Sequence, residues 1–373
     1  MKKILLSLLL FLMLVPFAFS TLSAQETDVL KDETLEGKIV EVIETKNISF
    51  EDGSLRQKYQ KLKIYINKGS IKSQEIVVES GAFPSANIVE YKVGDKVLIT
   101  KSVGIDGESE FYITDYVRRT PMLILSLIFV LLTVLIGRIR GALSLLGMGI
   151  SFAVIFVMIL PRILSGGDPV ETAILGSFII IPATFFLSHG FNKKTGVAIA
   201  GTLLSLIVVG VLSVIFVDLV KLTGFASEEA GFLQTMIGES INIKGLLLAG
   251  IIIGVLGVLD DITISQSAIV YQLKKANSSL KAGELYKRAM DIGQDHISSM
   301  VNTLVLVYAG AALPLLIIFV SGSHSFSEII NYEIVADEVV RTMVGSIGLI
   351  MAVPITTFIA TMVVSSSKIS KEK

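Results

Sequence analysis

Two adjacent aspartates, Asp260 and Asp261, stand at the end of an apolar run that is long enough to cross a lipid bilayer. A carboxylate in the hydrocarbon costs roughly 2.5 to 3.5 kcal/mol on insertion scales, so an acid in a membrane helix suggests a functional site. Such a carboxylate could bind a cation, carry a proton or hold another substrate. Further polar side chains follow on the same helix and could complete the site: Thr263, Ser265, Gln266 and Ser267.

The depth of the two aspartates has two interpretations. In the first, a helix from Gly245 to Leu273 holds both acids inside the membrane. In the second, only Ile243 to Leu259 crosses, about 17 residues at 1.5 Å each, and both acids lie among the lipid headgroups. Length does not separate the two interpretations, because either segment is long enough to span.

Helical periodicity divides this segment into two sides. Gly250, Gly254 and Gly257 fall on the side of Asp261, as in the stripes of small residues that let two membrane helices approach closely. We therefore expect the helix to pack through its glycine and aspartate side, with lipid against the other side. That other side is apolar and contains Ile262, Ile269, Val270 and Leu273.

A second polar group opens the next apolar segment, DHISSMVNTLVLVYAGAALPLL. A buried amide without a partner is costly, so Asn302 is expected to face another helix or a wet cavity, with Asp260 and Asp261 as the obvious partners. Asp295 lies on the same helical face as Asn302. The neighbouring His296 could relay protons, or it could simply be solvated at the membrane surface.

The composition is that of a membrane protein. Apolar residues make up 52% of the chain and the mean hydropathy is +0.74, above the range of soluble enzymes. A net charge of −1 gives no support to nucleic-acid binding. The absence of cysteine excludes disulfides and thiolate chemistry, and three histidines leave too few ligands for a structural zinc site. We expect no metal and no cofactor.

An enzyme is not expected. Intramembrane aspartyl proteolysis needs two acids that converge on one water, whereas Asp260 and Asp261 diverge by about 100° on a helix. No nucleophile, metal cluster or phosphate-binding loop accompanies Asp295, which could otherwise supply a second acid.

The chain divides into three parts. Residues 1–24 combine two lysines, an apolar core and small residues, which indicates a signal peptide or an anchor helix. Residues 25–118 contain about five or six short segments rich in Ile, Val and Tyr, typical of an exported all-β domain with a barrel-like fold. Residues 119–373 form a multi-pass transmembrane domain. The fold class is thus an α-helical integral membrane protein with a small exported β domain.

The apolar segments predict about seven crossings. They run from about Pro121 to Ile136, Ala142 to Leu164, Pro169 to Leu187, Thr195 to Val220, Ile243 to Leu273, Ser299 to Val320, and Val339 to Val364. Basic connections alternate with acidic ones, and under the positive-inside rule the basic set, including the C-terminus, is cytoplasmic. Residues 25–118 are then extracytoplasmic. Arg118 and Arg119 lie on the extracytoplasmic side in this topology, which is weak evidence against it.

The connection from Lys274 to His296 has a helical composition. We expect an amphipathic helix along the cytoplasmic surface, with Leu280, Leu285 and Met290 towards lipid. Its lysines could contact anionic lipid or could only set the topology.

Two stretches, GVLGVLDDITISQSAIVYQL and IGQDHISSMVNTLVLVYAGAALPLL, resemble the YibE/F-like family of bacterial multi-pass membrane proteins. The resemblance extends over most of the chain and implies a protein of the bacterial plasma membrane. It implies no reaction, substrate or cofactor.

Two functions remain as hypotheses. The first is a secondary transporter or ion-translocating protein, in which the aspartates and their polar neighbours bind a small ion or a proton. The second is a membrane scaffold or receptor that transports nothing and binds an extracellular partner through the β domain. In either case the lipid bilayer is a partner, nucleic acid is not, and the protein could form a homo-oligomer.

Overall fold

The structure, a computed structural model, describes residues 32–49, 56–84, 89–104, 108–238, 241–322 and 325–366. The predicted signal peptide or anchor at residues 1–24 lies outside the described residues. Contacts divide the chain into two compact units, one within Met13–Leu132 and the other containing Thr133–Lys373. We call them the sheet unit and the helical unit.

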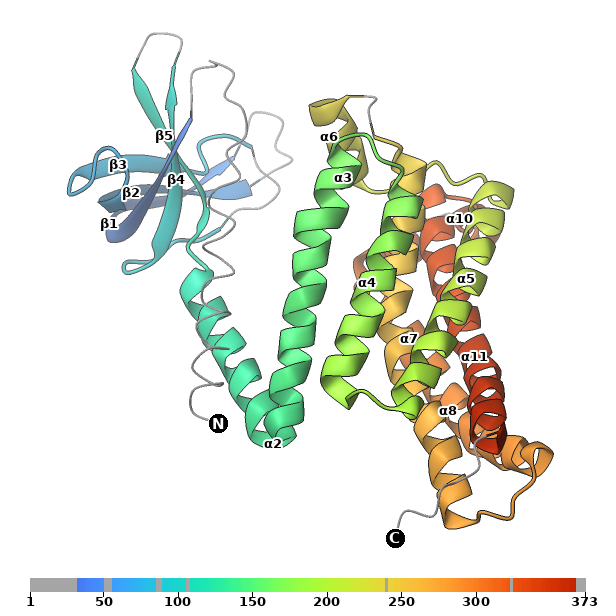
Figure 1. The fold of residues 1–373 in the computed structure, drawn as a ribbon. Helices are drawn as coiled ribbons and strands as arrows, with labels where there is room; N and C mark the ends of the chain where they lie inside the picture. Colours follow the sequence, from blue (N-terminus) through green and yellow to red (C-terminus); the bar gives the residue numbers. More distant parts are fainter. Residues whose placement is uncertain are drawn as a thin grey trace. The chain divides into compact units, whose positions relative to one another are not determined.

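The sheet unit is one antiparallel sheet in the order β3-β2-β1-β4-β5 (Figure 1). Its strands are β1 (Glu33–Ser49), β2 (Arg56–Lys68), β3 (Glu75–Ser80), β4 (Lys96–Val103) and β5 (Ser109–Tyr116). Alternate residues such as Leu35 and Ile39 on β1 and Leu62 and Ile64 on β2 are fully buried, as the period of two requires. The predicted small β domain is confirmed.

The sheet curls around this core but does not close. The edge strands β3 and β5 approach each other, yet no strand pairing joins them in the described part of the chain. A cleft of about 750 Å³ lies there, with Tyr91, Tyr112, Asp115 and Arg118 among its lining residues.

The helical unit is built from long apolar helices. In chain order the helices are α2 (Arg119–Val154), the π-helix η2 (Ile155–Ile159), α3 (Leu160–Leu164), α4 (Pro169–His189), α5 (Lys193–Leu219), α6 (Glu228–Ile237), α7 (Ile243–Ala276), α8 (Ala282–Ala311), α9 (Leu313–Ser321), α10 (Phe326–Ile329) and α11 (Glu333–Ser366). The first of them begins in the sheet unit.

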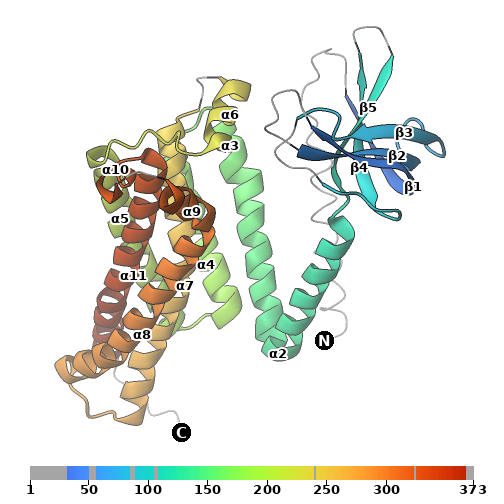
Figure 2. The same ribbon diagram turned by 180° about the vertical axis from the view of Figure 1, so that it is seen from behind.

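Five helical segments of the described chain are long and apolar enough to cross a membrane, or six if a bent pair forms one span. The first, Arg119–Leu164, is interrupted at Arg138, whose backbone (φ 53°, ψ −134°) joins two helices. This interruption falls between the first two predicted crossings. The bent pair is α8 and α9, which meet at 67° (Figure 2) beside Pro314, whose ring and missing N–H disfavour a continuous helix. The membrane-helix class is confirmed, and the count of seven crossings stays a prediction.

Helices α5, α7 and α11 pack against one another and form the centre of the helical unit, with α4 and α8 also against α7 (Figures 1 and 2). Glycine permits the closest approach of α11 to α5. A Cβ added to Gly348 would lie 2.2 Å from Val209 Cγ2, and one added to Gly201 would lie 2.2 Å from Thr356 Oγ1.

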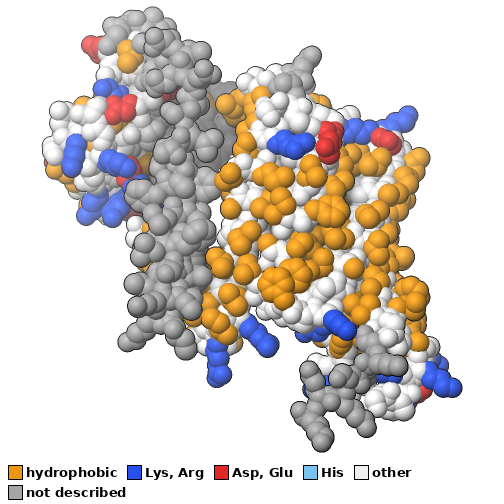
Figure 3. Space-filling view, in the orientation of Figure 1, with side chains coloured by type: hydrophobic (Ala, Val, Ile, Leu, Met, Phe, Trp, Pro, Cys, Tyr) orange, Lys and Arg blue, Asp and Glu red, His pale blue; other side chains and the backbone are white. Residues whose placement is uncertain are grey.

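Charged side chains gather at the two ends of the helical unit, and hydrophobic side chains cover the face between them (Figure 3). We call the end that carries Lys194 and Lys275 the basic end. The opposite end, which carries Glu228 and Glu333, is the acidic end.

The predicted amphipathic helix exists, but its orientation was wrong. It is the first half of α8, which continues without a break into the following apolar segment. Leu280 and Leu285 are buried against Val270 and Ala360 instead of facing lipid. Neighbouring apolar side chains on α7 and α11 bury these leucines as well as lipid would, so the amphipathic pattern alone did not distinguish protein from lipid.

Candidate functional site

The two aspartates lie at the middle of α7. Ser267 Oγ donates a hydrogen bond to the backbone oxygen of Lys194 in the first turn of α5, at 2.9 Å. Asp260 precedes Ser267 by two helical turns, so it lies about 10 Å further along the axis from the basic end. Asp260 is half-buried and Asp261 is exposed. Neither carboxylate has a hydrogen bond or ion pair with another described residue.

The expected cluster of the aspartates with Asn302 is not formed within the chain. Asn302, Asp295 and His296 are all exposed on α8, and no hydrogen bond joins Asn302 to another helix in the described structure. The buried side of α8 carries Gly293 and Leu304. Asn302 precedes Leu304 by two residues and so points about 160° away from it around the helix. Of the two predicted surroundings of Asn302, another helix is not found within the described chain, and a wet cavity stays a prediction.

The glycine stripe also lies on the surface of the chain. Gly250, Gly254 and Gly257 are exposed, and a Cβ added to any of them would meet nothing within 4 Å among the described residues. Ile262 and Val270, expected to face lipid, are buried. The predicted orientation of α7 is therefore reversed within this chain. Lipid tails are as apolar as leucine, so hydrophobicity gives an apolar arc no preference for lipid over protein.

The buried face of α7 instead carries polar groups into the contact with α5. Thr263 Oγ1 lies 2.7 Å from Thr202 Oγ1, and both residues are fully buried. Each hydroxyl also lies within hydrogen-bond distance of a carbonyl of its own helix, at 2.9 Å for Thr263 and 3.0 Å for Thr202. Thr263 Oγ1 also lies 3.3 Å from the carbonyl oxygen of Asp260. Two hydroxyls hold only two protons for these four contacts, so the pair has more than one way to arrange its hydrogen bonds.

Gln266 connects α7 to two further helices. Its Nε2 donates to the backbone oxygen of Ala289 on α8 at 2.9 Å and to Thr357 Oγ1 on α11 at 2.7 Å. Thr357 in turn donates to the carbonyl of Val353 at 2.7 Å. All of these groups are buried, so Gln266 fixes the relative positions of three helices from inside the bundle.

Some buried oxygens in this region have no protein partner in the described structure. They include Gln266 Oε1 and Thr356 Oγ1, which belong to fully buried residues, and Thr195 Oγ1 on α5. Leaving such a group unsatisfied costs about 1 to 3 kcal/mol. We use the term polar seam for Thr202, Thr263, Gln266, Thr356 and Thr357, which lie where α5, α7 and α11 meet.

The polar seam contains only part of the predicted site. Thr263 and Gln266 belong to it, Ser267 lies beside it, and Ser265 is half-buried outside it. Sequence reasoning missed Thr202, although the hydroxyl residues Thr195, Thr202 and Ser205, seven and three residues apart on one side of α5, were a signal. In the described residues no group of three or more His, Asp or Glu is placed to hold a metal ion.

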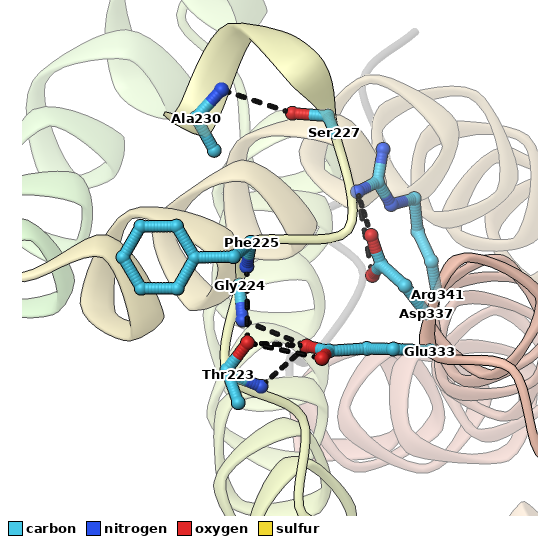
Figure 4. A network of polar contacts seen from close by, with 8 residues as sticks. All are labelled: Thr223, Gly224, Phe225, Ser227, Ala230, Glu333, Asp337 and Arg341. Atoms are coloured by element: carbon cyan, nitrogen blue, oxygen red, sulfur yellow. Dashed lines mark hydrogen bonds and ion pairs between the residues drawn. The ribbon is translucent and has the colours of Figure 1, made fainter. Parts of the chain in front are cut away.

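The acidic end is fixed by Glu333 at the start of α11 (Figure 4). Its carboxylate accepts hydrogen bonds from the backbone N–H of Thr223 at 2.5 Å, the hydroxyl of Thr223 at 2.8 Å and the N–H of Gly224 at 3.1 Å. The backbone of Gly224 has φ of +87°, a left-handed conformation that favours glycine over other residues. One turn into α11, Asp337 forms an ion pair with Arg341 at 3.2 Å. The Glu333 contacts tie the segment that follows α5 to the start of α11.

Comparison with models of known protein families identifies the family of this chain. The model of the YibE/F-like protein family matches residues 125–366, about two thirds of the chain, from α2 to the end of α11. The match includes both stretches that carried the resemblance and all of the polar seam, and leaves the sheet outside. Neither the curated proteins nor the solved structures gave a match. The chain therefore belongs to the YibE/F-like protein family.

Proposed function

We propose that this protein is a membrane transport protein that moves a small cation or a proton through the helical unit. The observation that carries the proposal is the polar seam, a set of fully buried hydroxyl and amide groups at the meeting of three apolar helices. Polar groups inside a membrane helix bundle are costly and mark ion and proton pathways. Two acceptor oxygens of the seam, Gln266 Oε1 and Thr356 Oγ1, have no hydrogen-bond partner among the described residues.

The chemistry of the seam suits a hard cation or a proton carrier. Neutral oxygen ligands from hydroxyl and amide groups bind alkali or alkaline-earth ions, and hydroxyl pairs with alternative proton arrangements pass protons. Asp260 supplies negative charge one turn before Thr263 on α7, on the side of the seam away from the basic end. In this proposal Asp260 attracts the cation and the seam oxygens replace part of its hydration shell.

A flux measurement tests the proposal. The purified chain is reconstituted in vesicles, and uptake of Na⁺, K⁺ and H⁺ is followed under imposed gradients. We expect Asp260→Asn and Gln266→Leu to reduce flux at least about tenfold, the loss of roughly 1.4 kcal/mol of transition-state stabilisation. Asp261→Asn and Gln294→Leu are matched controls, because Asp261 and Gln294 are exposed, and they should retain flux.

Two results would contradict this function. One is background flux for the natural chain under every gradient, with correct insertion shown by protease protection. The other is flux that is present but equal in all four variants, which would move the pathway away from the polar seam.

We further propose the plasma membrane as the location, with residues 25–118 extracytoplasmic and the C-terminus cytoplasmic. The support is the positive-inside rule applied to the basic end, where Lys194, Lys274 and Lys275 lie. The chain has no cysteine, so single-cysteine labelling gives a clean test. An impermeant maleimide added to intact cells should label Glu229→Cys at the acidic end and should leave Ser279→Cys at the basic end unlabelled. The opposite pattern would invert the topology.

A second function is favoured by the cleft in the sheet unit. The cleft lies between the edge strands and offers aromatic side chains beside charged ones, Tyr91 and Tyr112 beside Asp115 and Arg118. This combination suits an extracellular partner such as a peptide. Deletion of residues 25–118 separates the functions. If a cellular phenotype disappears with this deletion and survives Asp260→Asn and Gln266→Leu, the scaffold or receptor function is correct.

A further inference from the structure

A pocket of about 360 Å³ lies at the basic end of the helical unit, apart from the polar seam. It is formed by the first turn of α5, the last turns of α7 and the end of α11. Four lysines line it, and no acidic side chain is among the described residues of its wall. The residues that matter here are Lys194, Lys274 and Lys275, together with Ala268, Tyr271 and Val364.

Two of the pocket's four lysines stand where a helix disfavours them, whereas Lys274 and Lys275 lie in the last turn of α7, where cations are favourable. Lys193 and Lys194 are the first two residues of α5, and its first turn has no acidic residue. The N-terminus of a helix carries a partial positive charge, so cations are unfavourable there and an anion is favourable. At the start of α5 this partial charge adds to that of Lys193 and Lys194, and Lys274 and Lys275 contribute two further positive charges from the last turn of α7, so the pocket favours an anionic group.

The walls of the pocket are apolar as well as basic. Ala268 and Val364 contribute aliphatic surface and Tyr271 contributes its ring. The ammonium group of Lys274 is held at the end of α7 by a hydrogen bond to the backbone oxygen of Leu280, at 2.7 Å. Charged groups therefore stand directly beside apolar surface in one pocket. A small inorganic anion would use only the charged part.

We propose that this pocket binds an anionic phospholipid, with the phosphate between Lys194 and Lys275 and the start of an acyl chain along Ala268 and Val364. The ligand must carry both a phosphate and an apolar chain, which a membrane lipid supplies and free phosphate does not. The site lies at the end of helices long enough to span a bilayer, the level at which headgroups lie. This proposal does not depend on the transport function.

Lipid binding to the full chain in a neutral detergent tests the proposal. Native mass spectrometry measures the affinity for phosphatidylglycerol, with phosphatidylcholine of the same acyl chains and inorganic phosphate as the two comparisons. We expect preference for phosphatidylglycerol, and the double variant Lys194→Gln with Lys275→Gln should bind it about thirtyfold more weakly. The matched control, Lys281→Gln with Lys287→Gln, removes the same charge from exposed positions at the same end and should change affinity less than about threefold.

A second variant keeps the charges and fills the pocket. Ala268→Phe should also lose phosphatidylglycerol, although all four lysines remain, and its elution as a single species shows that it is folded. Equal affinity for the two lipids, or equal loss in the pocket and control variants, would overturn the proposal. Displacement of phosphatidylglycerol by inorganic phosphate at millimolar concentration would overturn it too, because the ligand would then be the free anion.

Discussion

Thr202 on α5 and Thr263 on α7 place their hydroxyl oxygens 2.7 Å apart at the buried contact between the two helices. The pair connects elements that lie far apart in the sequence and contributes two members of the polar seam. At this contact α7 directs the Thr263 hydroxyl inward, whereas its glycine stripe, Gly250, Gly254 and Gly257, faces outward.

A double-mutant cycle measures this pair. Thr202→Val and Thr263→Val keep the shape of each side chain and remove one hydroxyl. Hydrogen bonds between membrane helices average about 0.6 kcal/mol in such cycles and reach about 1.7 kcal/mol, so we expect a coupling energy in that range. The measurement is the free energy of unfolding in mixed micelles. Additive effects of the two substitutions would show that the hydroxyls do not interact.

Glycines of the helical unit should differ sharply in their tolerance of alanine. A Cβ at Gly348 would meet Val209 Cγ2 at 2.2 Å, and a valine cannot turn away easily, so we expect Gly348→Ala to cost about 1 to 3 kcal/mol of unfolding free energy. Gly254→Ala is the matched control, since nothing lies within 4 Å of its added Cβ. Thermal unfolding in detergent compares the two. A large loss of thermal stability in Gly254→Ala would indicate that a second chain packs against the glycine stripe.

Glu333 should protect the loop that follows α5. Replacing Glu333 by alanine removes the acceptor for the N–H groups of Thr223 and Gly224. Hydrogen bonds to a charged group contribute about 1.5 to 3 kcal/mol, so we expect amide exchange in this loop to accelerate by about 10- to 100-fold. Hydrogen–deuterium exchange with mass spectrometry measures it. Glu229→Ala, an exposed acid at the same end, should leave the loop unchanged, and equal exchange in both variants would contradict the assigned role of Glu333.

In the sheet unit, the pKa of Glu33 should depend on Ser70. The hydroxyl of Ser70 donates to the Glu33 carboxylate, its backbone N–H donates at 2.6 Å, and together they hold the pKa of Glu33 below its ordinary value. A lowered pKa in the folded state means that the carboxylate stabilises the fold above its unfolded-state pKa, and that this contribution is lost as the pH falls through the folded-state pKa.

The test of this relationship is a carbon-13 titration of the Glu33 carboxyl in the full chain. We expect Ser70→Ala to raise the pKa of Glu33 towards the ordinary value, because the hydroxyl contact is the largest cause of the shift. Ser109→Ala, at an exposed position of β5, serves as the control. An identical titration in both variants would show that Ser70 does not set the pKa.

Much of the architecture could be predicted from the sequence because its signals are local. Short segments rich in Ile, Val and Tyr predicted a small β domain, and apolar runs placed α4, α5 and α7 within a few residues of their observed ends. Part of the site was also local, since Thr263 and Gln266 were named from the polar residues that follow the aspartates. The bend between α8 and α9 was signalled by Pro314.

The direction in which each helix faces was decided only by the tertiary structure. In a soluble protein water selects the apolar face for burial, but in a bilayer both lipid and protein accept an apolar arc, so Ile262 could face either. Packing against α5 and α11 turned Thr263 and Gln266 inward and left Gly254 and Asn302 outward. The sequence by itself determined which segments become membrane helices. Which polar groups meet between them depended on how closely glycines such as Gly348 let neighbouring helices approach, a contact that joins residues far apart in the chain.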